Sequence, residues 1–203
     1  MDDKVQAVLA EYHERMKREQ QERREGRDPD TWQERHMLSV GPDSGRLINI
    51  LARGLEAPNI LELGTSYGYS GIWLGAAARE TGGRLTTMEL HEHKAAHARS
   101  MAEKAGLASY IDFRLGDAVE MIQSLDSGID FVLLDLWKDL YLPCLEAFYP
   151  RLNPGAIIVA DNILYPGGEN VRRYVEAVRS RPGMRSLLLP VGTGLEVSRY
   201  KAD

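Results

Sequence analysis

The sequence has little of what marks secreted, membrane-embedded or nucleic-acid-binding proteins. It contains a single cysteine, Cys144, in 203 residues, so no disulfide can form within the chain. No apolar stretch approaches the ~20 residues of a membrane-spanning helix, and the acidic N-terminus MDDKV lacks the apolar run of a signal peptide. The net charge of −5 disfavours binding to a phosphate backbone. We therefore expect a cytoplasmic protein with no membrane anchor and no nucleic-acid partner.

The remaining composition is that of an ordinary globular protein. Hydrophobic residues make up 43% and charged residues 27% of the chain. A chain of 203 residues buries roughly 70% of its unfolded surface, which is enough for a sizeable core. The sequence has no internal repeat and no low-complexity linker, so we expect a single domain over residues 1–203.

The segment 58–70, PNILELGTSYGYS, carries the strongest local signal. Its apolar run is typical of a short buried strand that ends at Gly64. Residues 65–68 would form a turn, and Ser70 would cap a helix that continues through the alanines at 76–78. A strand, a glycine turn and a helix form the first half of a nucleotide-binding unit, in which the helix N-terminus offers unpaired N–H groups. The alternative is a plain strand-to-helix turn without a ligand.

Strands and helices alternate along the rest of the chain. Further strands are predicted at 84–90, 110–116, 129–135, 155–162, 185–191 and 195–200. Helices are predicted between them, through 95–105, 119–122, 139–149 and 168–181. This alternation predicts an α/β fold with a mostly parallel sheet and helices on both faces. The last two strands flank a short glycine turn, so one strand must be antiparallel.

Two helices are expected before the first strand. Apolar residues recur near helical spacing over 2–25, and the charge run 17–27 is either a basic binding tail or a solvated helix face. We favour the solvated face because acidic residues are interleaved. The segment would end at a group of helix breakers, Gly26, Asp28 and Pro29. The second helix would be capped by Asp43 or Ser44 and would bury four apolar residues, Leu47, Ile48, Ile50 and Leu51.

The residues that follow each strand are informative, because ligands of open α/β sheets bind at the carboxyl ends of the strands. Glu89 ends the second predicted strand, about 25 residues after Gly64, and its carboxylate could accept both ribose hydroxyls of a nucleoside. A surface acid at a strand end is the alternative. Asp117 follows the third strand and either caps the next helix or binds an adenine amine.

Oxygen-bearing side chains also follow the fourth and fifth strands. Asp135 and Lys138 come after the fourth strand, and Asp161 and Asn162 come after the fifth. Neighbouring parallel strands lie about 4.8 Å apart, so these side chains can converge on one point. Two carboxylates and an amide oxygen suit a divalent cation, with Mg²⁺ expected and Mn²⁺ or Ca²⁺ as alternatives. Two helix caps would give the same pattern without a metal.

The glycine spacing and three motifs point to a family. The turn Gly64-x-x-x-Gly68 lacks the second glycine of the dinucleotide fingerprint, which disfavours NAD. The segment ELGTSYGYS resembles motif I of S-adenosylmethionine-dependent O-methyltransferases, in the metal-dependent group that includes the catechol and caffeoyl-CoA enzymes. LDLWKDLYLP and ADN resemble the two segments of those enzymes that supply the metal ligands and the catalytic lysine. The resemblance runs from about Leu38 to Tyr200 and implies a Rossmann-like seven-stranded sheet.

The resemblance implies a role for each matching residue. Lys138 would be the base, and the metal ligands would be Asp135, Asp161 and Asn162. Glu62 would lie where the methyl donor carries its sulfonium and ammonium groups. The implied donor-binding residues are Val40, Glu62, Gly64, Thr65, Ser66, Tyr67, Gly68, Ser70, Glu89, Leu90, Asp117, Ala118, Asp135 and Trp137. The expected activity is methyl transfer from S-adenosylmethionine to a hydroxyl of a small catechol-like aromatic.

Some features keep alternatives open. The animal catechol enzyme places a late carboxylate against the second hydroxyl of its acceptor, whereas Leu187 falls near that position here, and Leu136 replaces a polar residue. The alternatives are a non-catechol acceptor and a donor-binding protein without activity.

Trp137 either packs on the donor or lies in the core. The N-terminal helix, within 1–30, would be a lid or a contact in a homodimer. The cluster His91, His93 and His97 is expected to be a solvated helix face and not a zinc site.

Overall fold

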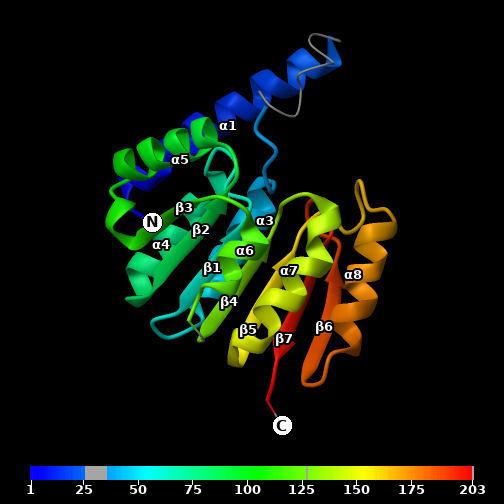
Figure 1. Ribbon diagram of the computed structural model, residues 1–203. Coiled ribbons are helices and arrows are strands. Elements are labelled where there is room, and N and C mark those ends of the chain that lie inside the picture. The colour runs from blue at the N-terminus through cyan, green and yellow to red at the C-terminus, as the bar shows by residue number, and fades with distance from the viewer. Residues whose placement is uncertain (26–35, 127, 203) are drawn as a thin grey trace.

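A computed structural model describes residues 1–25, 36–126 and 128–202, and seven strands in these ranges form one sheet (Figure 1). The strand order is β3-β2-β1-β4-β5-β7-β6. The strands are β1 (Asn59–Leu63), β2 (Arg84–Glu89), β3 (Ile111–Leu115), β4 (Ile129–Leu134), β5 (Leu152–Ala160), β6 (Met184–Leu189) and β7 (Leu195–Tyr200). β7 is antiparallel to both of its neighbours, and the other pairs are parallel. The predicted mostly parallel sheet with one antiparallel strand is confirmed.

Helices cover both faces of the sheet, as predicted. They are α1 (Asp3–Arg24), α3 (Pro42–Arg53), α4 (Tyr69–Thr81), α5 (Glu92–Lys104), α6 (Ala118–Gln123), α7 (Tyr141–Phe148) and α8 (Glu169–Ser180). Short 3₁₀ turns lie at Ala108–Tyr110, Lys138–Leu140 and Tyr149–Arg151. α6, α7 and α8 pack one core and lie in front of the sheet in Figure 1, whereas α1, α3, α4 and α5 contribute to the core on the other face.

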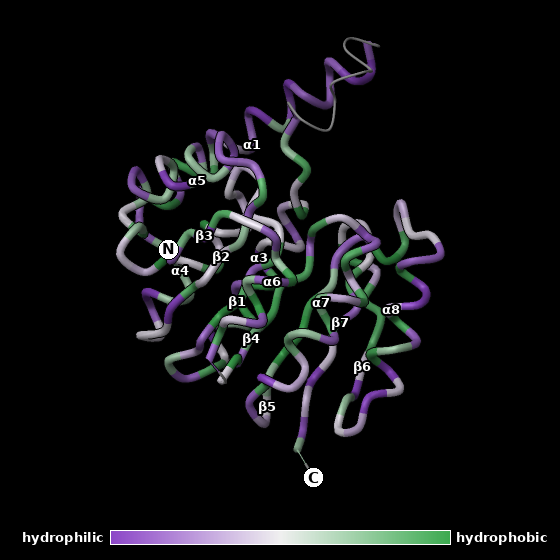
Figure 2. Tube along the Cα trace, viewed as in Figure 1, coloured by the Kyte–Doolittle hydropathy of each residue, from purple (hydrophilic) through white to green (hydrophobic). Residues whose placement is uncertain are grey.

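The direction of chain winding reverses between β1 and β4. β1 pairs with β2 on one side and with β4 on the other, and β5 follows β4 outward. Figure 2 shows these central strands as mainly hydrophobic, which agrees with their burial on both faces. The carboxyl ends of β1, β4 and β5 therefore meet at the switch point, where ligands of such sheets bind.

Two predicted helix starts are wrong, and so is one predicted core residue. α3 begins at Pro42 and not at Asp43 or Ser44, because the fixed backbone angle of proline suits the first helical position. α4 begins at Tyr69, after Gly68 at φ 93°, so Ser70 is not its cap. Ile50 is 64% exposed whereas Ile48 is fully buried. Two residues in a helix lie about 200° apart, which puts Ile48 and Ile50 on opposite faces.

α1 agrees with the predicted helix to within a residue at each end. Its buried stripe consists of Val5, Val8, Leu9 and Tyr12. Over residues 17–25 the side chains are exposed except for the half-buried Glu19, and the far part of the helix is mainly hydrophilic (Figure 2), which supports the solvated-face interpretation of its charge run. The predicted breakers Gly26, Asp28 and Pro29 lie outside the described residues. No helix within the described ranges is long and apolar enough to cross a membrane.

We expect the two isoleucines of α3 to respond oppositely to truncation. Ile48→Ala should lower the free energy of unfolding by about 2–5 kcal/mol, because it removes a fully buried side chain and leaves a cavity. Ile50→Ala, on the exposed face of the same helix, should change it by less than about 0.5 kcal/mol. Urea unfolding of both variants measures the difference, and equal losses would contradict this orientation of α3.

Candidate functional site

The turn between β1 and α4 lies directly against the end of β4. Gly64 adopts φ 99°, and a side chain there would overlap the backbone carbonyl of Asp135. The N–H groups of Gly64 and Thr65 both donate to the carbonyl of Met88, each at 3.1 Å. Gly68 at φ 93° would place a side chain 2.7 Å from the Cβ of Ala98 in α5. Glycine at both positions therefore lets the turn fit between its neighbours.

Glu62 is fully buried beneath this turn. Thr87 Oγ1 donates to Glu62 Oε2 at 2.6 Å, and Thr65 Oγ1 lies 2.5 Å from Thr87 Oγ1. Burial raises the pKa of Glu62 from its usual 4.5 to about 7, although hydrogen bonds from Ser70 and Thr87 oppose that rise. The other carboxylate oxygen of Glu62 and the hydroxyl of Ser66 are buried without a partner among the described residues. Orphaned buried oxygens fit a ligand with cationic or donor groups at this turn.

Glu89 and Asp117 each bind backbone N–H groups. Glu89 Oε2 accepts from the Ser66 N–H at 2.7 Å, and Oε1 accepts from the N–H groups of Leu90 and His91, both at 3.0 Å. The strand-end acid therefore shapes the glycine turn, and ribose binding by Glu89 stays a prediction. Asp117 caps α6, because its Oδ1 accepts from the Glu120 N–H at 3.0 Å. The capping interpretation of Asp117 is thus confirmed, and adenine binding stays a prediction.

Several predicted donor-binding residues lie around the same edge of the sheet. Ser70 follows in the first turn of α4, and Ala118 begins α6. Val40 is buried at 1% exposure, in the segment that leads into α3. Leu90 and Trp137 are 60% and 48% exposed, so Trp137 does not belong to the core. The half-exposed indole excludes the core alternative and leaves donor packing as the prediction.

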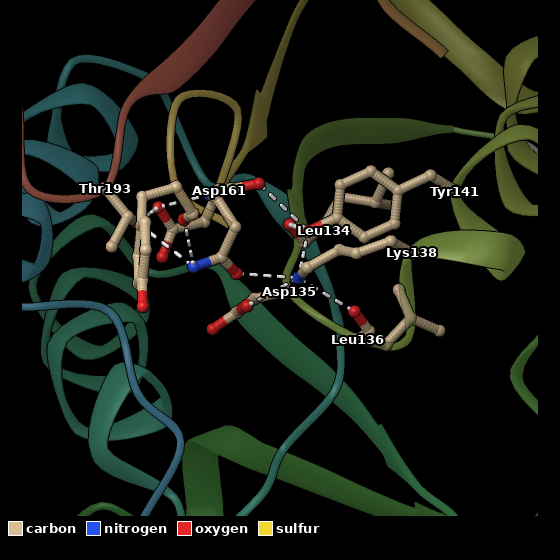
Figure 3. A network of polar contacts seen from close by, with 9 residues as sticks. Leu134, Asp135, Leu136, Lys138, Tyr141, Asp161 and Thr193 are labelled. Atoms are coloured by element: carbon tan, nitrogen blue, oxygen red, sulfur yellow. Dashed lines mark hydrogen bonds and ion pairs between the residues drawn. The ribbon is translucent and has the colours of Figure 1, made fainter. Parts of the chain in front are cut away.

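The oxygen atoms after β4 and β5 do converge, around the ammonium of Lys138 (Figure 3). Lys138 Nζ donates to Asn162 Oδ1 at 2.6 Å, to the Tyr141 hydroxyl at 2.8 Å and to the Leu136 carbonyl at 2.9 Å. Asp135 Oδ1 lies 3.5 Å from the same nitrogen. The predicted convergence of Asp135, Lys138 and Asn162 is therefore confirmed. Asp161 joins the same cluster through hydrogen bonds that it shares with Asn162 and Thr193.

The two carboxylates are held close to one positive charge. Burial raises the pKa of Asp135, an effect that the charge of Lys138 opposes and the charge of Asp161 increases. Burial also raises the pKa of Asp161, which hydrogen bonds from Thr193 and the Asn162 N–H oppose. With both carboxylates ionised, the cluster carries one more negative than positive charge. This excess and the oxygen donor set fit a divalent cation.

The structure contains no cluster of three His, Cys, Asp or Glu side chains suited to a metal within the part of the chain it describes. That finding agrees with the predicted ligand set, which has only two carboxylates and takes its third oxygen from an amide. His93 is exposed, but His91 and His97 are half-buried, and the His97 ring lies 5.3 Å from the ring of Tyr67. The solvated-face interpretation is therefore correct for His93 alone.

Sequence reasoning missed two residues that order the oxygen cluster. Thr193 Oγ1 donates to Asp161 Oδ1 at 2.6 Å and accepts from Asn162 Nδ2 at 3.1 Å, which turns the amide oxygen of Asn162 toward Lys138. The buried Tyr141 hydroxyl lies 3.0 Å from the Asp161 carbonyl. Tyr141 could have been found, because it lies three residues after Lys138 at a helix start. Thr193 lies in the β6–β7 turn and carries no such signal.

The fold and the two adjoining sites define a class: a nucleoside-binding α/β protein with an oxygen-lined cluster beside its glycine turn. A family model described as "Methyltransferase domain" matches residues 61–163, about half of the chain. The match begins within β1 and includes the glycine turn, Lys138 and Asn162. The chain belongs to this methyltransferase family, in the branch of S-adenosylmethionine-dependent O-methyltransferases that the relatives below represent.

The relatives agree with this assignment. The chain is 37% identical over 134 residues to a catechol O-methyltransferase of Niastella koreensis, and the alignment covers 64% of the chain and 60% of that protein. It is 32% identical over 178 residues to "Probable O-methyltransferase Rv1703c" of Mycobacterium tuberculosis, covering 82% of the chain and 74% of that protein. The structure of the O-methyltransferase TomG from Streptomyces achromogenes, in complex with SAM, matches with a TM-score of 0.78 at 27% identity, over 100% of the chain and 91% of TomG. The chain thus spans less than two thirds of the Niastella relative.

The raised pKa of Glu62 should make stability depend on pH. Between its usual pKa of 4.5 and about 7, the folded protein binds more protons at Glu62 than the unfolded chain does. The contribution of Glu62 to the free energy of unfolding therefore falls as the pH rises through this range. Glu62→Gln cannot ionise, so it should gain about 1–3 kcal/mol relative to the wild type between pH 5 and pH 8.

Urea unfolding of the ligand-free protein at the two pH values measures this gain. Glu103→Gln, on the exposed face of α5, provides the matched control and should show the same difference from wild type at both pH values. A Glu62→Gln difference that does not change with pH would argue against a buried carboxyl that is protonated in the folded state.

Proposed function

We propose that the protein is a divalent-metal-dependent O-methyltransferase that methylates a hydroxyl of a small catechol-like aromatic. The observation that carries the proposal is the convergence of Asp135, Asn162 and Lys138 at one point, beside the turn that would hold S-adenosylmethionine. The catechol O-methyltransferase named among the relatives supports the choice of acceptor. A cytoplasmic setting is part of the proposal, and it rests on a lone buried cysteine with no disulfide.

Donor binding would rest on the acids of β1 and β2. Glu62 offers a buried, unpartnered carboxylate oxygen close to the glycine turn, where the positive groups of the donor would be stabilised. Glu89 would accept the ribose hydroxyls with the lone pairs that its N–H contacts leave. The donor, when bound, supplies a methyl group on a positively charged sulfur. Holding this methyl near the acceptor oxygen would provide much of the rate enhancement.

The metal would be held by Asp135, Asp161 and Asn162. A bound divalent cation would stabilise the phenolate of a vicinal diol and thereby make it nucleophilic at neutral pH. Lys138 Nζ would accept the proton of the attacking hydroxyl. The ammonium of Lys138 contacts the oxygens of Asp135 and Asn162, which are two of these ligands. A bound metal and the ammonium would therefore compete for the same ligands, so the metal would displace Lys138 from them.

The acceptor side is more apolar than the resembling animal enzyme implies. Leu187 is 63% exposed on β6 and faces the same side of the sheet as Val197. Leu164 and Tyr165, in the loop after Asn162, are 56% and 64% exposed. These side chains favour an aromatic acceptor with apolar substituents over catechol itself.

Lys138→Ala should lower kcat by about 100-fold or more, because it removes the group that takes the hydroxyl proton. The affinity for S-adenosylhomocysteine should change less than about threefold, since the lysine is placed on the acceptor side. Lys17→Ala, which removes an exposed lysine of α1, serves as the control and should keep full activity. Turnover assays measure kcat and calorimetry measures the affinity for S-adenosylhomocysteine. An unchanged kcat would remove Lys138 from the mechanism.

Removal of divalent metal with EDTA should abolish turnover while S-adenosylhomocysteine still binds, and Mg²⁺ should restore turnover. A vicinal diol such as a substituted catechol should be methylated, whereas its analogue with one hydroxyl already methylated should not be, because chelation needs both oxygens. A mass-spectrometric assay with and without chelator reads out both effects. Equal methylation of the two acceptors in EDTA would instead indicate a metal-independent enzyme that does not require a vicinal diol.

A further inference from the structure

The N-terminal helix α1 contacts the glycine turn between β1 and α4, here called the donor turn, with a polar group from its buried stripe. The hydroxyl of Tyr12 donates to the backbone carbonyl of Tyr67 at 2.6 Å, across 55 residues of sequence. Tyr12 is only 1% exposed, and its ring packs edge-on against Tyr69 and His97. His13, the next residue of α1, lies 2.8 Å from the hydroxyl of Tyr69. The two chain positions that flank Gly68 are therefore both held by α1.

A second set of contacts joins α1 to the segment 36–40, which contains the predicted donor-binding residue Val40. The guanidinium of Arg15 lies 3.9 Å from the ring centre of Tyr67. Its Nε also pairs with Glu19 Oε1 at 2.6 Å, and Glu19 Oε2 accepts from the Met37 N–H at 2.9 Å. A continuous series of contacts thus runs from the donor turn through Arg15 and Glu19 to the segment that carries Val40.

The donor turn has a shape that needs such support. Ser66 adopts φ 47°, a left-handed conformation that costs a residue other than glycine about 1 kcal/mol or more. Its N–H is held by Glu89 at 2.7 Å, and the carbonyl of the following residue, Tyr67, is held by Tyr12. The two hydrogen bonds fix the turn from opposite sides, one from β2 and one from α1.

We infer that α1 keeps the donor site preorganised, with Tyr12 and the Arg15–Glu19 pair as positioning residues for S-adenosylmethionine. This inference rests on the proposed function and adds a role for a helix that the lid and homodimer interpretations do not describe. Packing alone would need only the apolar stripe of Val5, Val8 and Leu9. The polar contacts named above go instead to the turn 65–70 and to the segment 36–40, the two parts of the chain that would enclose the donor.

Tyr12→Phe tests the hydrogen bond while keeping the ring. We expect the Kd for S-adenosylhomocysteine, measured by calorimetry, to rise about threefold to tenfold, the range that loss of one net hydrogen bond produces. The KM for the donor should rise by a similar factor while kcat at saturating donor stays unchanged. Tyr174→Phe is the matched control, because the Tyr174 hydroxyl is also buried but has no partner among the described residues, and it should leave both constants unchanged.

Glu19→Gln tests the second set of contacts, and it should also raise the Kd, because the amide weakens the pairing with Arg15. Glu14→Gln, which weakens an exposed pair with Lys17 on the same helix, should not change it. If the wild type binds S-adenosylhomocysteine and both Tyr12→Phe and Glu19→Gln bind it equally well, α1 is only a packing element and the inference is wrong. If the wild type itself does not bind S-adenosylhomocysteine, the proposed function fails and the inference fails with it.

Discussion

The arrangement of side chains at the carboxyl ends of β4 and β5 depends on the contacts of the Lys138 ammonium. Asp135 and Asp161 are largely removed from water, and the repulsion between two such carboxylates is offset by a nearby cation. Lys138 supplies that cation, and Asn162 and Tyr141 complete its contacts. The remaining excess of negative charge in this buried cluster favours the binding of a further cation. The lysine that would act in catalysis is therefore also the group that offsets the negative charge of these carboxylates.

The donor side and the acceptor side share one piece of backbone. Gly64 fits against the carbonyl of Asp135, so the glycine turn and the oxygen cluster cannot move independently. The β1–β4 pairing, which joins Leu63 to Leu134, fixes this neighbourhood from below. Since methyl transfer requires the two reactants in near-attack geometry, a rigid shared strand end provides the alignment that flexible loops would lose. The switch point of the sheet is therefore the origin of the geometry as well as the location of the site.

The order of elements and the ends of the strands could be predicted because both depend on local pattern. Apolar runs that stop at glycine or aspartate located β1 and β4 to within a residue or so, and the helix predicted through 95–105 ends just before Gly106 at φ 69°. Helix starts were less predictable, since Pro42 and Gly68 replaced the polar caps that the pattern favoured. The contacts of Tyr12 and Thr193 could not be predicted, because their partners lie 55 and 32 residues away along the chain.

The shape of the donor turn illustrates why such long-range contacts matter. A turn with Ser66 in a left-handed conformation is not the lowest-energy form of an isolated segment, so neighbouring elements must stabilise it. Glu89 and Tyr12 do so from β2 and from α1. A ligand that meets a turn already in its binding conformation does not lose affinity to ordering it. The N-terminal helix packs on the domain by its first half and contacts the donor turn through Tyr12 and Arg15. It would thereby form part of the binding site.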